Sequence, residues 1–327
     1  MEAWIFHALG NNFENLTLKG TAGTGQGNSL NNYLIGNASN NTLQGFGGND
    51  SLFGAGGNDT TYGSLGDDTY VVTEFGDVLS ENASEGTDTV ESWIFHQLGN
   101  NVENLILMGS AITGQGNGLN NVLTGNASNN VLQGNGGADT MAGGLGNDTY
   151  VVTEFGDVVT EAGAAGTDTV EAWIFHALSA NVDNLVLKGV ALTGTGNALA
   201  NTITGNASAN QLDGGLGNDT MTGGAGADNF LFTTALAGNV DAITDFVVAD
   251  DTMRLENAVF TVLPNGILAA GSFVTGAGAV DANDFIIYDA GTGAIFYDAD
   301  GSGAGLQVQF ATVTPGLVLT NADFFVV

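Results

Sequence analysis

Cysteine is absent from the 327 residues, which excludes disulfide bonds and thiolate metal ligands. Basic side chains are nearly absent as well: Lys19, Lys188 and Arg254 stand against 35 Asp and Glu residues, and the formal net charge is -32. Charge of this sign argues against nucleic acid as a partner and opposes any compact state through self-repulsion. We therefore expect a hard cation from solvent, bound by oxygen ligands, to neutralise the folded chain.

Proline and long apolar runs are also scarce. Only 2 prolines accompany 52 glycines, a ratio that argues against collagen or a flexible linker and predicts many tight turns. The N-terminal segment MEAWIFHALG lacks the basic and apolar regions of a signal peptide, and no run of roughly 18 uncharged apolar residues occurs. We therefore expect neither a signal peptide nor membrane insertion, whereas 43% hydrophobic residues allow a sizeable core.

A large repeat runs through the chain. Its three copies begin with EAWIFHALGNN at Glu2, ESWIFHQLGNN at Glu91 and EAWIFHALSAN at Glu171. Three copies predict a repeat architecture, in which corresponding residues lie one large repeat apart along an axis.

Histidine and tryptophan recur once in each copy of this repeat. The histidines are His7, His96 and His176, and the tryptophans are Trp4, Trp93 and Trp173. Because a solenoid holds the three histidines one large repeat apart, we expect neither a zinc site nor a catalytic centre there. Alternation along TVESWIF predicts that the tryptophans are packing residues on a strand, with an aromatic binding stripe as the alternative.

A shorter repeat of nine residues lies inside the large one. Three of its units match the pattern GGxGxDxUx, where U is a large apolar residue: GGLGNDTYV from Gly143, GGLGNDTMT from Gly214 and GGAGADNFL from Gly223. Units in the same phase begin at Gly27, Gly36, Gly45, Gly54 and Gly63, at Gly116, Gly125, Gly134 and Gly143, and at Gly196, Gly205, Gly214 and Gly223. Recurrence in phase makes the motif specific.

This pattern resembles the RTX (repeats-in-toxin) family of bacterial proteins, which are exported by type I secretion. The resemblance covers nearly the whole chain, and the segments between the nonapeptide blocks, such as the one from Asn147, resemble the spacers of that family. It implies an all-β fold, a parallel β-roll or β-solenoid with spacer coils, that binds several calcium ions. It also implies the type I secretion machinery as a partner and a secreted, extracellular or cell-surface location.

The nonapeptide itself predicts the coil. Each unit places about six glycine-rich residues before a three-residue stretch, so a turn is followed by a short strand, and two units close one coil. Position eight is large and apolar, and its stacking between coils builds a continuous core. The predicted core residues are Leu34, Leu43, Leu52, Tyr70, Leu132, Met141, Tyr150, Leu212, Met221 and Phe230, and Thr61 breaks the pattern.

Position six of the unit carries the candidate calcium ligands. Coils stacked about 4.8 Å apart bring units n and n+2 together, and calcium, which takes about six to eight oxygen ligands, turns the repulsion between two carboxylates into a shared site. The phase continues into EFGDVL and EFGDVV, but in the third copy it reaches Ala237, where we expect the row to stop. The predicted ligands are Asp50, Asp59, Asp68, Asp77, Asp139, Asp148, Asp157, Asp219 and Asp228, with the pairs Asp50 and Asp68, Asp59 and Asp77, and Asp139 and Asp157.

Asparagine replaces aspartate at position six of the units GNASNNTLQ, GNASNNVLQ and GNASANQLD. The neutral amides of Asn41, Asn130 and Asn210 are weaker calcium ligands than carboxylates. We predict that these units are structural coils with ladders of hydrogen-bonded asparagines rather than full calcium sites.

The glycine period ends near Thr233. We predict two domains, a calcium-binding solenoid over 1-232 and a β-rich cap over 233-327, in which FIIYDAGTGAIFYD and FYDADGSGAGLQVQF carry the hairpin signals of a β-meander. Asp298 and Asp300, in DADGSG, are predicted as further calcium ligands. The ending from Asp323 to Val327 resembles a type I secretion signal, and an ordinary final strand is the alternative.

No nucleophile, metalloprotease or phosphate-binding motif is present, so we predict that the chain is not an enzyme. The first functional hypothesis is an extracellular calcium-binding structural protein of a matrix, surface layer or filament, which folds on calcium binding after export. The chain begins inside the large repeat, and an uncapped first coil would stack head to tail on another copy. The alternatives are the C-terminal folding and secretion module of a larger RTX enzyme, toxin or adhesin, and a carbohydrate-binding or calcium-buffering surface protein.

Overall fold

The computed structural model describes Met1–Val327, which form two compact units, Met1–Gly166 and Thr167–Val327. Both units consist of β-strands and turns, and the helical segments are two short 3₁₀ helices, η1 (Ala270–Ser272) and η2 (Asn321–Asp323). None of the helices has the length and apolar character needed to cross a membrane. The predicted all-β solenoid of parallel coils is confirmed in each unit.

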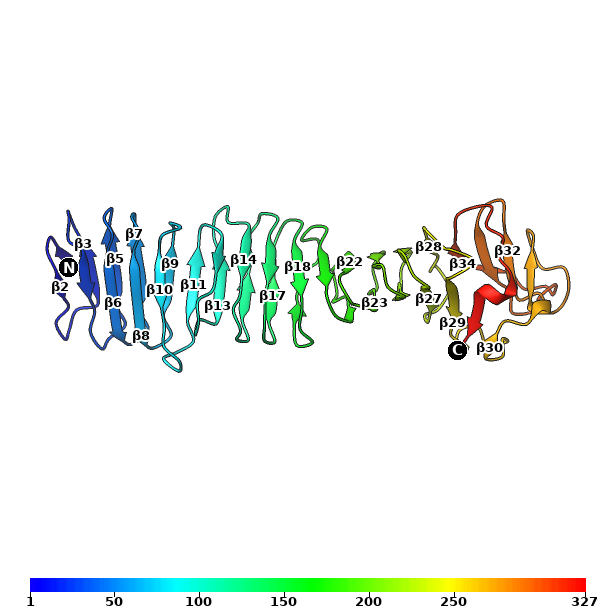
Figure 1. The fold of residues 1–327 in the computed structure, drawn as a ribbon, viewed down its shortest axis with the longest axis horizontal. Coiled ribbons are helices and arrows are strands. Elements are labelled where there is room, and N and C mark those ends of the chain that lie inside the picture. Colours follow the sequence, from blue (N-terminus) through cyan, green and yellow to red (C-terminus); the bar gives the residue numbers. More distant parts are fainter. The chain divides into compact units, whose positions relative to one another are not determined.

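The first unit is built from parallel strands that lie side by side in sequence order (Figure 1). One ten-stranded sheet takes every second strand of the chain. Its members are β1 (Glu2–Ala3), β3 (Asn15–Leu18), β5 (Tyr33–Asn37), β7 (Ser51–Ala55), β9 (Thr69–Val72), β11 (Thr89–Ser92), β13 (Asn104–Leu107), β15 (Val122–Thr124), β17 (Thr140–Ala142) and β19 (Val158–Val159).

The intervening strands of this unit form the other side of the coils, in two groups. The first group is β2 (His7–Ala8), β4 (Thr24–Gln26), β6 (Thr42–Gly47), β8 (Thr60–Leu65) and β10 (Val78–Ser80), and the second is β12 (His96–Gln97), β14 (Thr113–Gln115), β16 (Val131–Gln133) and β18 (Thr149–Val152). All of these pairs are parallel, as expected when each coil returns to the same side before the next begins.

The register stacks equivalent residues of successive coils. Leu34 pairs with Leu52 and Leu52 with Tyr70, a step of two nonapeptides, so two units close one coil as predicted. The stacked side chains point inward because alternate residues of a strand face opposite sides. Every predicted position-eight core residue is buried, and Thr61, which breaks the pattern, is buried as well. Apolar burial along this row supplies the main driving force for coil stacking.

Glycine at position four of the acidic units fixes the turn. Gly57 has φ of 105°, and a Cβ there would meet the backbone of Ser39 and Asn40 in the preceding coil at about 3 Å. A side chain would therefore both strain the backbone and separate the coils.

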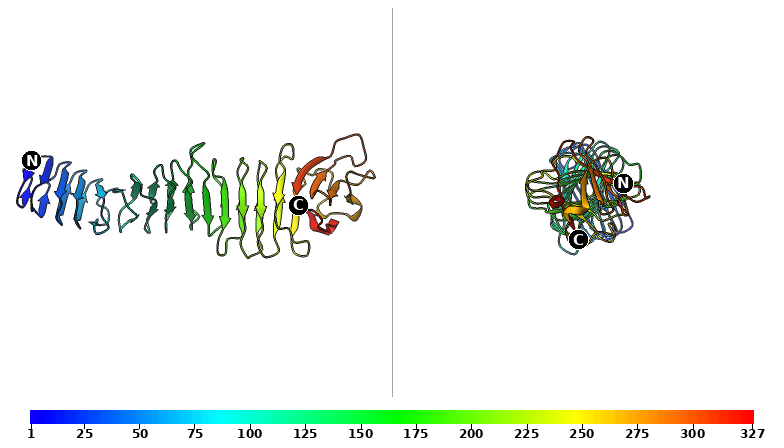
Figure 2. Two further views of the ribbon diagram at one scale, coloured as in Figure 1. Left: turned by 90° about the horizontal axis from the view of Figure 1, so that it is seen from above. Right: turned by 90° about the vertical axis from the view of Figure 1, so that its right-hand side faces the viewer.

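The second unit is also built from coils of parallel strands (Figure 2). One side holds β20 (Thr169–Ala172), β22 (Asn184–Leu187), β24 (Thr202–Thr204), β26 (Thr220–Thr222) and β28 (Asp241–Ile243). The other side holds β21 (His176–Ala177), β23 (Thr193–Thr195), β25 (Gln211–Asp213), β27 (Asn229–Phe232) and β29 (Thr252–Leu255).

A β-meander caps the C-terminal end of the coils in the second unit, and it is coloured orange to red in Figure 1. The two hairpins predicted from sequence are confirmed as antiparallel pairs, β32 (Ile286–Asp289) with β33 (Ala294–Tyr297), and β33 with β34 (Val308–Thr312). Strand β34 pairs with the last coil strand β28, and β35 (Phe324–Val326) pairs with β29. The remaining strands are β30 (Gly266–Ile267) and β31 (Phe273–Thr275).

Aromatic side chains fill the junction between coil and cap. The ring of Phe310 packs edge-to-face against Phe232, at 4.9 Å between centroids, and against Phe260, at 5.1 Å. The cap therefore covers both the open strand edges and the apolar interior of the last coil.

The prediction that the repeat tryptophans pack in the core is wrong. Trp93 is 39% exposed because strand β11 ends at Ser92, whose side chain takes the inward position. Trp4 is 68% exposed, and it follows Ala3, the buried last residue of β1. The chain bends at Trp93, and the indole lies over Gly109, where a Cβ would come within 3.0 Å of the ring. Trp93 thus faces outward, as Glu91 does, whereas the inward position that we expected for it is taken by Ser92.

Candidate metal centre

The position-six aspartates lie inside the turns and connect successive coils. In each acidic unit the carboxylate Oδ1 accepts a hydrogen bond from the backbone N–H of the position-six residue one coil earlier. Asn32 N donates to Asp50 Oδ1 at 2.7 Å, and Asp50 N donates to Asp68 Oδ1 at 2.7 Å. The same bond links Asp59, Asp139, Asp148, Asp219 and Asp228 to Asn41, Asn121, Asn130, Asn201 and Asn210. The predicted stacking of these side chains is therefore observed.

The second carboxylate oxygen of these aspartates is buried without a partner. No hydrogen bond reaches the Oδ2 atoms of Asp50, Asp59, Asp68, Asp139 and Asp219. Each Oδ2 faces the first glycine of its own unit, where a Cβ would overlap the carboxylate. A buried charged oxygen without a donor is costly, so the folded turn requires a cation or a proton at this point.

The asparagine units show why the acidic units differ. Asn28 N donates to Asn32 Oδ1 at 2.7 Å within one turn, and the Asn32 amide donates to the carbonyl of Phe13, which is a longer bond at 3.4 Å. Every described asparagine turn repeats the first bond, so the amide oxygen is satisfied by its own backbone. The asparagine units are therefore hydrogen-bonded coils, but these bonds close single turns instead of forming the predicted ladders between coils. The absence of full calcium sites in these units stays a prediction.

In the acidic units, the backbone conformation prevents the bond from the position-two N–H to the position-six side chain. Their position-two residues are in the left-handed region, for example Phe46 with φ of 80° and Ala55 with φ of 76°. The position-two residues of the asparagine units, such as Asn28, are absent from the residues with positive φ, whereas Asn135, at position two of an acidic unit, has φ of 70°. The left-handed turn directs the position-two N–H away from the position-six carboxylate, which leaves Oδ2 open for another ligand.

The electrostatics of the aspartate rows are unfavourable in the absence of a cation. Burial raises the pKa of Asp50 to about 7, the Asn32 amide offsets part of this rise, and the charge of Asp68 adds to it. Burial also raises the pKa values of Asp59, Asp68, Asp139 and Asp219 to about 6. Desolvation and like charge both oppose the ionised form, so the folded rows hold protons more tightly than free aspartates do, and a bound metal would replace these protons.

No basic side chain neutralises these rows. The Lys19 ammonium pairs with Glu2 at 3.3 Å, the Lys188 ammonium pairs with Glu171 at 3.0 Å, and the Arg254 guanidinium lies over the ring of Phe325. Carboxylate and carbonyl oxygens in glycine turns are the donor set that hard cations prefer. The residues present therefore fit calcium, which supplies positive charge between two coils when it is bound.

Two predicted ligands have a different local role. Asp77 accepts from Asp59 N through Oδ1, and its Oδ2 accepts from Thr73 N at 3.3 Å and Glu74 N at 3.1 Å. Asp157 makes the equivalent three bonds. Both oxygens of each carboxylate thus hold a spacer turn, and their role as calcium ligands stays a prediction.

The expectation that the row stops at Ala237 is wrong. Asp219 N donates to Asp241 Oδ1 at 3.0 Å, and Asp228 N donates to Asp251 Oδ1 at 2.9 Å. The spacer is longer than a nonapeptide at this point. The aspartates that continue the rows are therefore not separated from Asp219 and Asp228 by a multiple of nine residues. Asp88 continues the first row in the same way, accepting from Asp68 N at 2.8 Å.

A local sequence signal identifies two of these missed aspartates. Asp88-Thr89-Val90 and Asp251-Thr252-Met253 repeat the order Asp-Thr-apolar of the unit NDTYV. The motif marks the point at which a strand begins, whereas the count of nine residues fails wherever a spacer changes length.

Asp298 and Asp300 lie in the loop between β33 and β34. Asp300 N donates to Asp298 Oδ1 at 3.2 Å, and Asp300 Oδ2 accepts from Gly305 N at 3.0 Å. Burial raises the pKa of Asp298, whereas the Gly305 N–H lowers that of Asp300. Calcium binding by this loop stays a prediction.

Asp50→Asn is expected to raise the calcium concentration at the folding midpoint by roughly two- to tenfold, because it keeps the Oδ1 bond to Asn32 and removes one charged ligand. Far-UV circular dichroism during calcium titration measures this midpoint. Asp67→Asn is the matched control, since Asp67 is exposed in the next acidic turn and carries the same charge. Equal shifts in the two variants would show that net charge, not ligation, controls folding.

Comparison with known proteins agrees with this geometry. A family model described as the RTX calcium-binding nonapeptide repeat (4 copies) matches residues 26–61, 115–150 and 195–230, which contain both asparagine and acidic units. The endo-1,3-1,4-beta-glycanase EglC of Rhizobium meliloti (strain 1021) is 51% identical over 102 residues, which are 31% of this chain and 21% of the glycanase. The chain thus spans about a fifth of the length of this relative.

The stacked coils, the aspartates at position six and the matched segments agree on one kind of repeat, and several calcium ions fit the repeat copies. The chain carries RTX calcium-binding nonapeptide repeats over residues 26–61, 115–150 and 195–230.

Proposed function

We propose that this calcium-binding structural repeat protein is exported unfolded and folds outside the cell when calcium binds its aspartate rows. The observation that carries the proposal is the set of buried aspartate Oδ2 atoms without hydrogen-bond partners in the acidic turns. In the cytosol, where calcium is scarce, repulsion among 35 acidic residues favours the unfolded chain. At the roughly 10⁻⁴ to 10⁻³ M affinity of extracellular calcium modules, binding outside the cell drives folding.

The type I secretion machinery is the proposed partner in export. In the folded protein the final strand β35 lies between β29 and β30, and Phe324 and Val326 are fully buried. A signal in these residues would be accessible only before folding. This supports an order in which recognition and transport precede calcium binding, and it leads to a secreted or cell-surface protein.

Self-assembly of the folded protein is the second part of the proposal. Large apolar side chains of the WIF motif stay exposed in the first unit: Trp4, Ile5, Phe6, Trp93 and Phe95. Exposed apolar groups of this kind mark interaction surfaces. A second copy of the chain is the proposed occupant, as in a matrix, surface layer or filament.

Sedimentation velocity with and without calcium tests this assembly. We expect larger species to form with calcium at high protein concentration, and we expect Ile5→Ser with Phe6→Ser to reduce them because the exposed apolar surface is lost. Val280→Ser is the control, since Val280 is 77% exposed outside the motif. A single monomeric species at millimolar calcium would contradict self-assembly and leave calcium-dependent folding intact.

A second candidate function is supported by the glycanase similarity. The matched 102 residues make up 21% of that relative, so this kind of segment occurs within a larger protein named as an enzyme. The chain would then be the folding and secretion module of an RTX enzyme, toxin or adhesin. The mass of the natural secreted polypeptide distinguishes the two: a polypeptide much larger than 33.0 kDa supports the module.

A further inference from the structure

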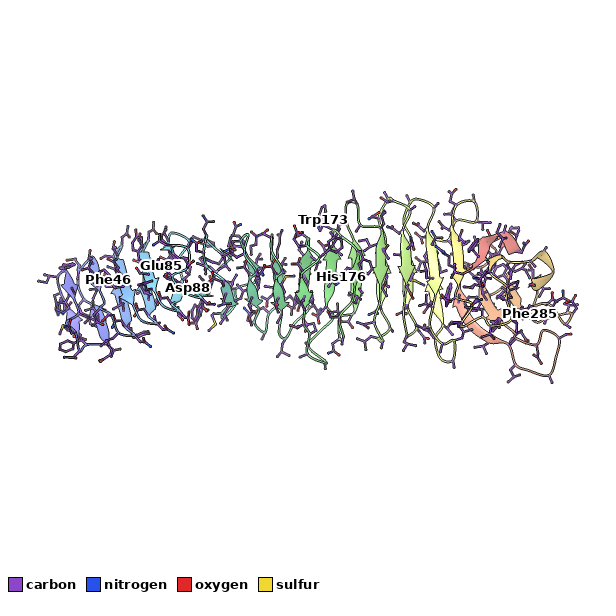
Figure 3. The ribbon with its side chains drawn as sticks, turned by 90° about the horizontal axis from the view of Figure 1, so that it is seen from below. Phe46, Glu85, Asp88, Trp173, His176 and Phe285 are labelled. Atoms are coloured by element: carbon purple, nitrogen blue, oxygen red, sulfur yellow. The ribbon has the colours of Figure 1, made fainter.

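Three acidic side chains meet where the first spacer joins the coils, and we refer to Asp68, Glu81 and Asp88 as the spacer acid cluster. One carboxylate oxygen from each residue lies within 4.8 Å of the others. Asp68 immediately precedes β9, Asp88 immediately precedes β11, and Glu81 immediately follows β10. Strands β9 and β11 pair in register from Thr69 and Thr89, so the fold itself brings the two aspartates together. Figure 3 labels Asp88 in this spacer, with Glu85 nearby.

Glu81 is the member of the cluster that the aspartate rows do not explain. Its side chain is 93% buried, since only 7% of its surface is exposed, and neither carboxylate oxygen has a hydrogen-bond partner. Asp68 Oδ2 is also buried and without a partner. Buried oxygens of Glu81 and Asp68 therefore lie in the cluster without a hydrogen-bond partner, which is the arrangement that a bound cation satisfies.

The remaining oxygens of the two aspartates have structural roles. Asp68 Oδ1 accepts from Asp50 N at 2.7 Å, and Asp88 Oδ1 accepts from Asp68 N at 2.8 Å. These bonds fix the two carboxylates, so each can present its other oxygen to an ion without rearrangement. Glu161 occupies the corresponding position in the second spacer and accepts a hydrogen bond from the Tyr150 hydroxyl, so its carboxylate also points into the coil.

The charge around the cluster excludes a protein cation as the neutraliser. The nearby ionisable groups are Asp67, Glu85 and Glu103, all acidic. Burial raises the pKa of Glu81 to about 8, and the charges of Asp88 and Asp68 add to this rise.

We propose that Asp68, Glu81 and Asp88 form a calcium site that fastens the first spacer to the coils, with Glu81 as a ligand from outside the aspartate row to which Asp68 and Asp88 belong. The inference rests on the proposed calcium-dependent folding. Carboxylates on three different segments give a site only when the spacer is docked, so binding stabilises the docked spacer. Glutamate is longer than aspartate by one methylene, which allows it to reach the row from the spacer side.

The test is the number of calcium ions bound per chain, measured by equilibrium dialysis at pH 7.5. Glu81→Gln keeps the size of the side chain and removes its charge, and we expect it to bind one ion fewer than the wild-type chain. Glu74→Gln is the control, because Glu74 is exposed in the same spacer. Far-UV circular dichroism at saturating calcium shows whether each variant is folded.

An unchanged number of ions in folded Glu81→Gln overturns the inference and identifies Glu81 as a buried protonated acid. If Glu81→Gln does not fold, Glu81→Asp decides, since it keeps the charge but withdraws the ligand. We then expect one ion to bind at least about tenfold more weakly, because loss of an outer partner alone costs about 10- to 100-fold in affinity. An unshifted titration also overturns the inference. Failure of the proposed function looks different: the wild-type chain would bind no calcium at all.

Discussion

Removal of calcium from the folded protein with a chelator at pH 7.5 is expected to abolish most of its β-structure. The chain carries a net charge of -32, and its buried carboxylate oxygens then have no counterion. Linkage gives the size of the effect: at ten times Kd, each site adds about 1.4 kcal/mol, and four such sites add about 5.6 kcal/mol. That sum reaches the lower end of the roughly 5–15 kcal/mol by which folded domains are stable. Far-UV circular dichroism measures the loss.

Magnesium at the same concentration is the control for this experiment. Magnesium requires compact octahedral coordination and gives up its waters reluctantly, so we expect it to restore little of the β-structure. Renewed addition of calcium should restore the signal in a steep transition, since several sites contribute together. A β-sheet spectrum that persists in chelator at pH 7.5 would show that the aspartate rows are neutralised without metal.

Acidification is expected to stabilise the chelated protein and to weaken calcium binding. The pKa values of Asp50 and Asp241 are raised to about 7, and those of Asp59, Asp68 and Asp139 to about 6, chiefly by burial. An unfolded aspartate has a pKa of about 3.9, so the folded chain without metal holds more protons than the unfolded chain between about pH 4 and pH 7. The stability from these protons is fully present below about pH 4 and is lost as the pH rises through 6 to 7.

Urea unfolding at pH 5, 6 and 7.5, each with chelator and with calcium, measures both effects. We expect the urea midpoint in chelator to rise as the pH falls, and the gain from added calcium to shrink because protons compete for the same oxygens. In chelator at pH 7.5, Asp50→Asn should stabilise the fold, because it removes a buried charge and keeps the bond from Asn32, whereas the exposed control Asp67→Asn should do so less. A flat pH profile in chelator would contradict the burial of ionisable carboxylates.

Much of the fold follows from the nonapeptide alone. Glycines at fixed positions require turns, the apolar residue at position eight requires an inward face, and a period of nine residues with two units per coil sets which residues stack. Leu34, Leu52 and Tyr70 lie in register for this reason. The distinction between asparagine and aspartate at position six also separates the two kinds of turn, because an amide and a carboxylate differ in charge and in ligand strength.

The tertiary structure determined the features that the nine-residue period does not specify, namely the backbone conformation in the turns and the contacts of the spacers. Left-handed backbone at position two leaves the Oδ2 atom of Asp50 open, and asparagine adopts it in an acidic unit, at Asn135, but not in an asparagine unit, at Asn28. Spacers of unequal length bring Asp88 and Asp241 into the rows out of phase, and the end of strand β11 turns Trp93 outward. Glu81 has no assigned position in the nonapeptide pattern, yet docking of its spacer buries it against Asp68. A local repeat fixes local geometry, whereas these contacts depend on how the longer segments return to the coil.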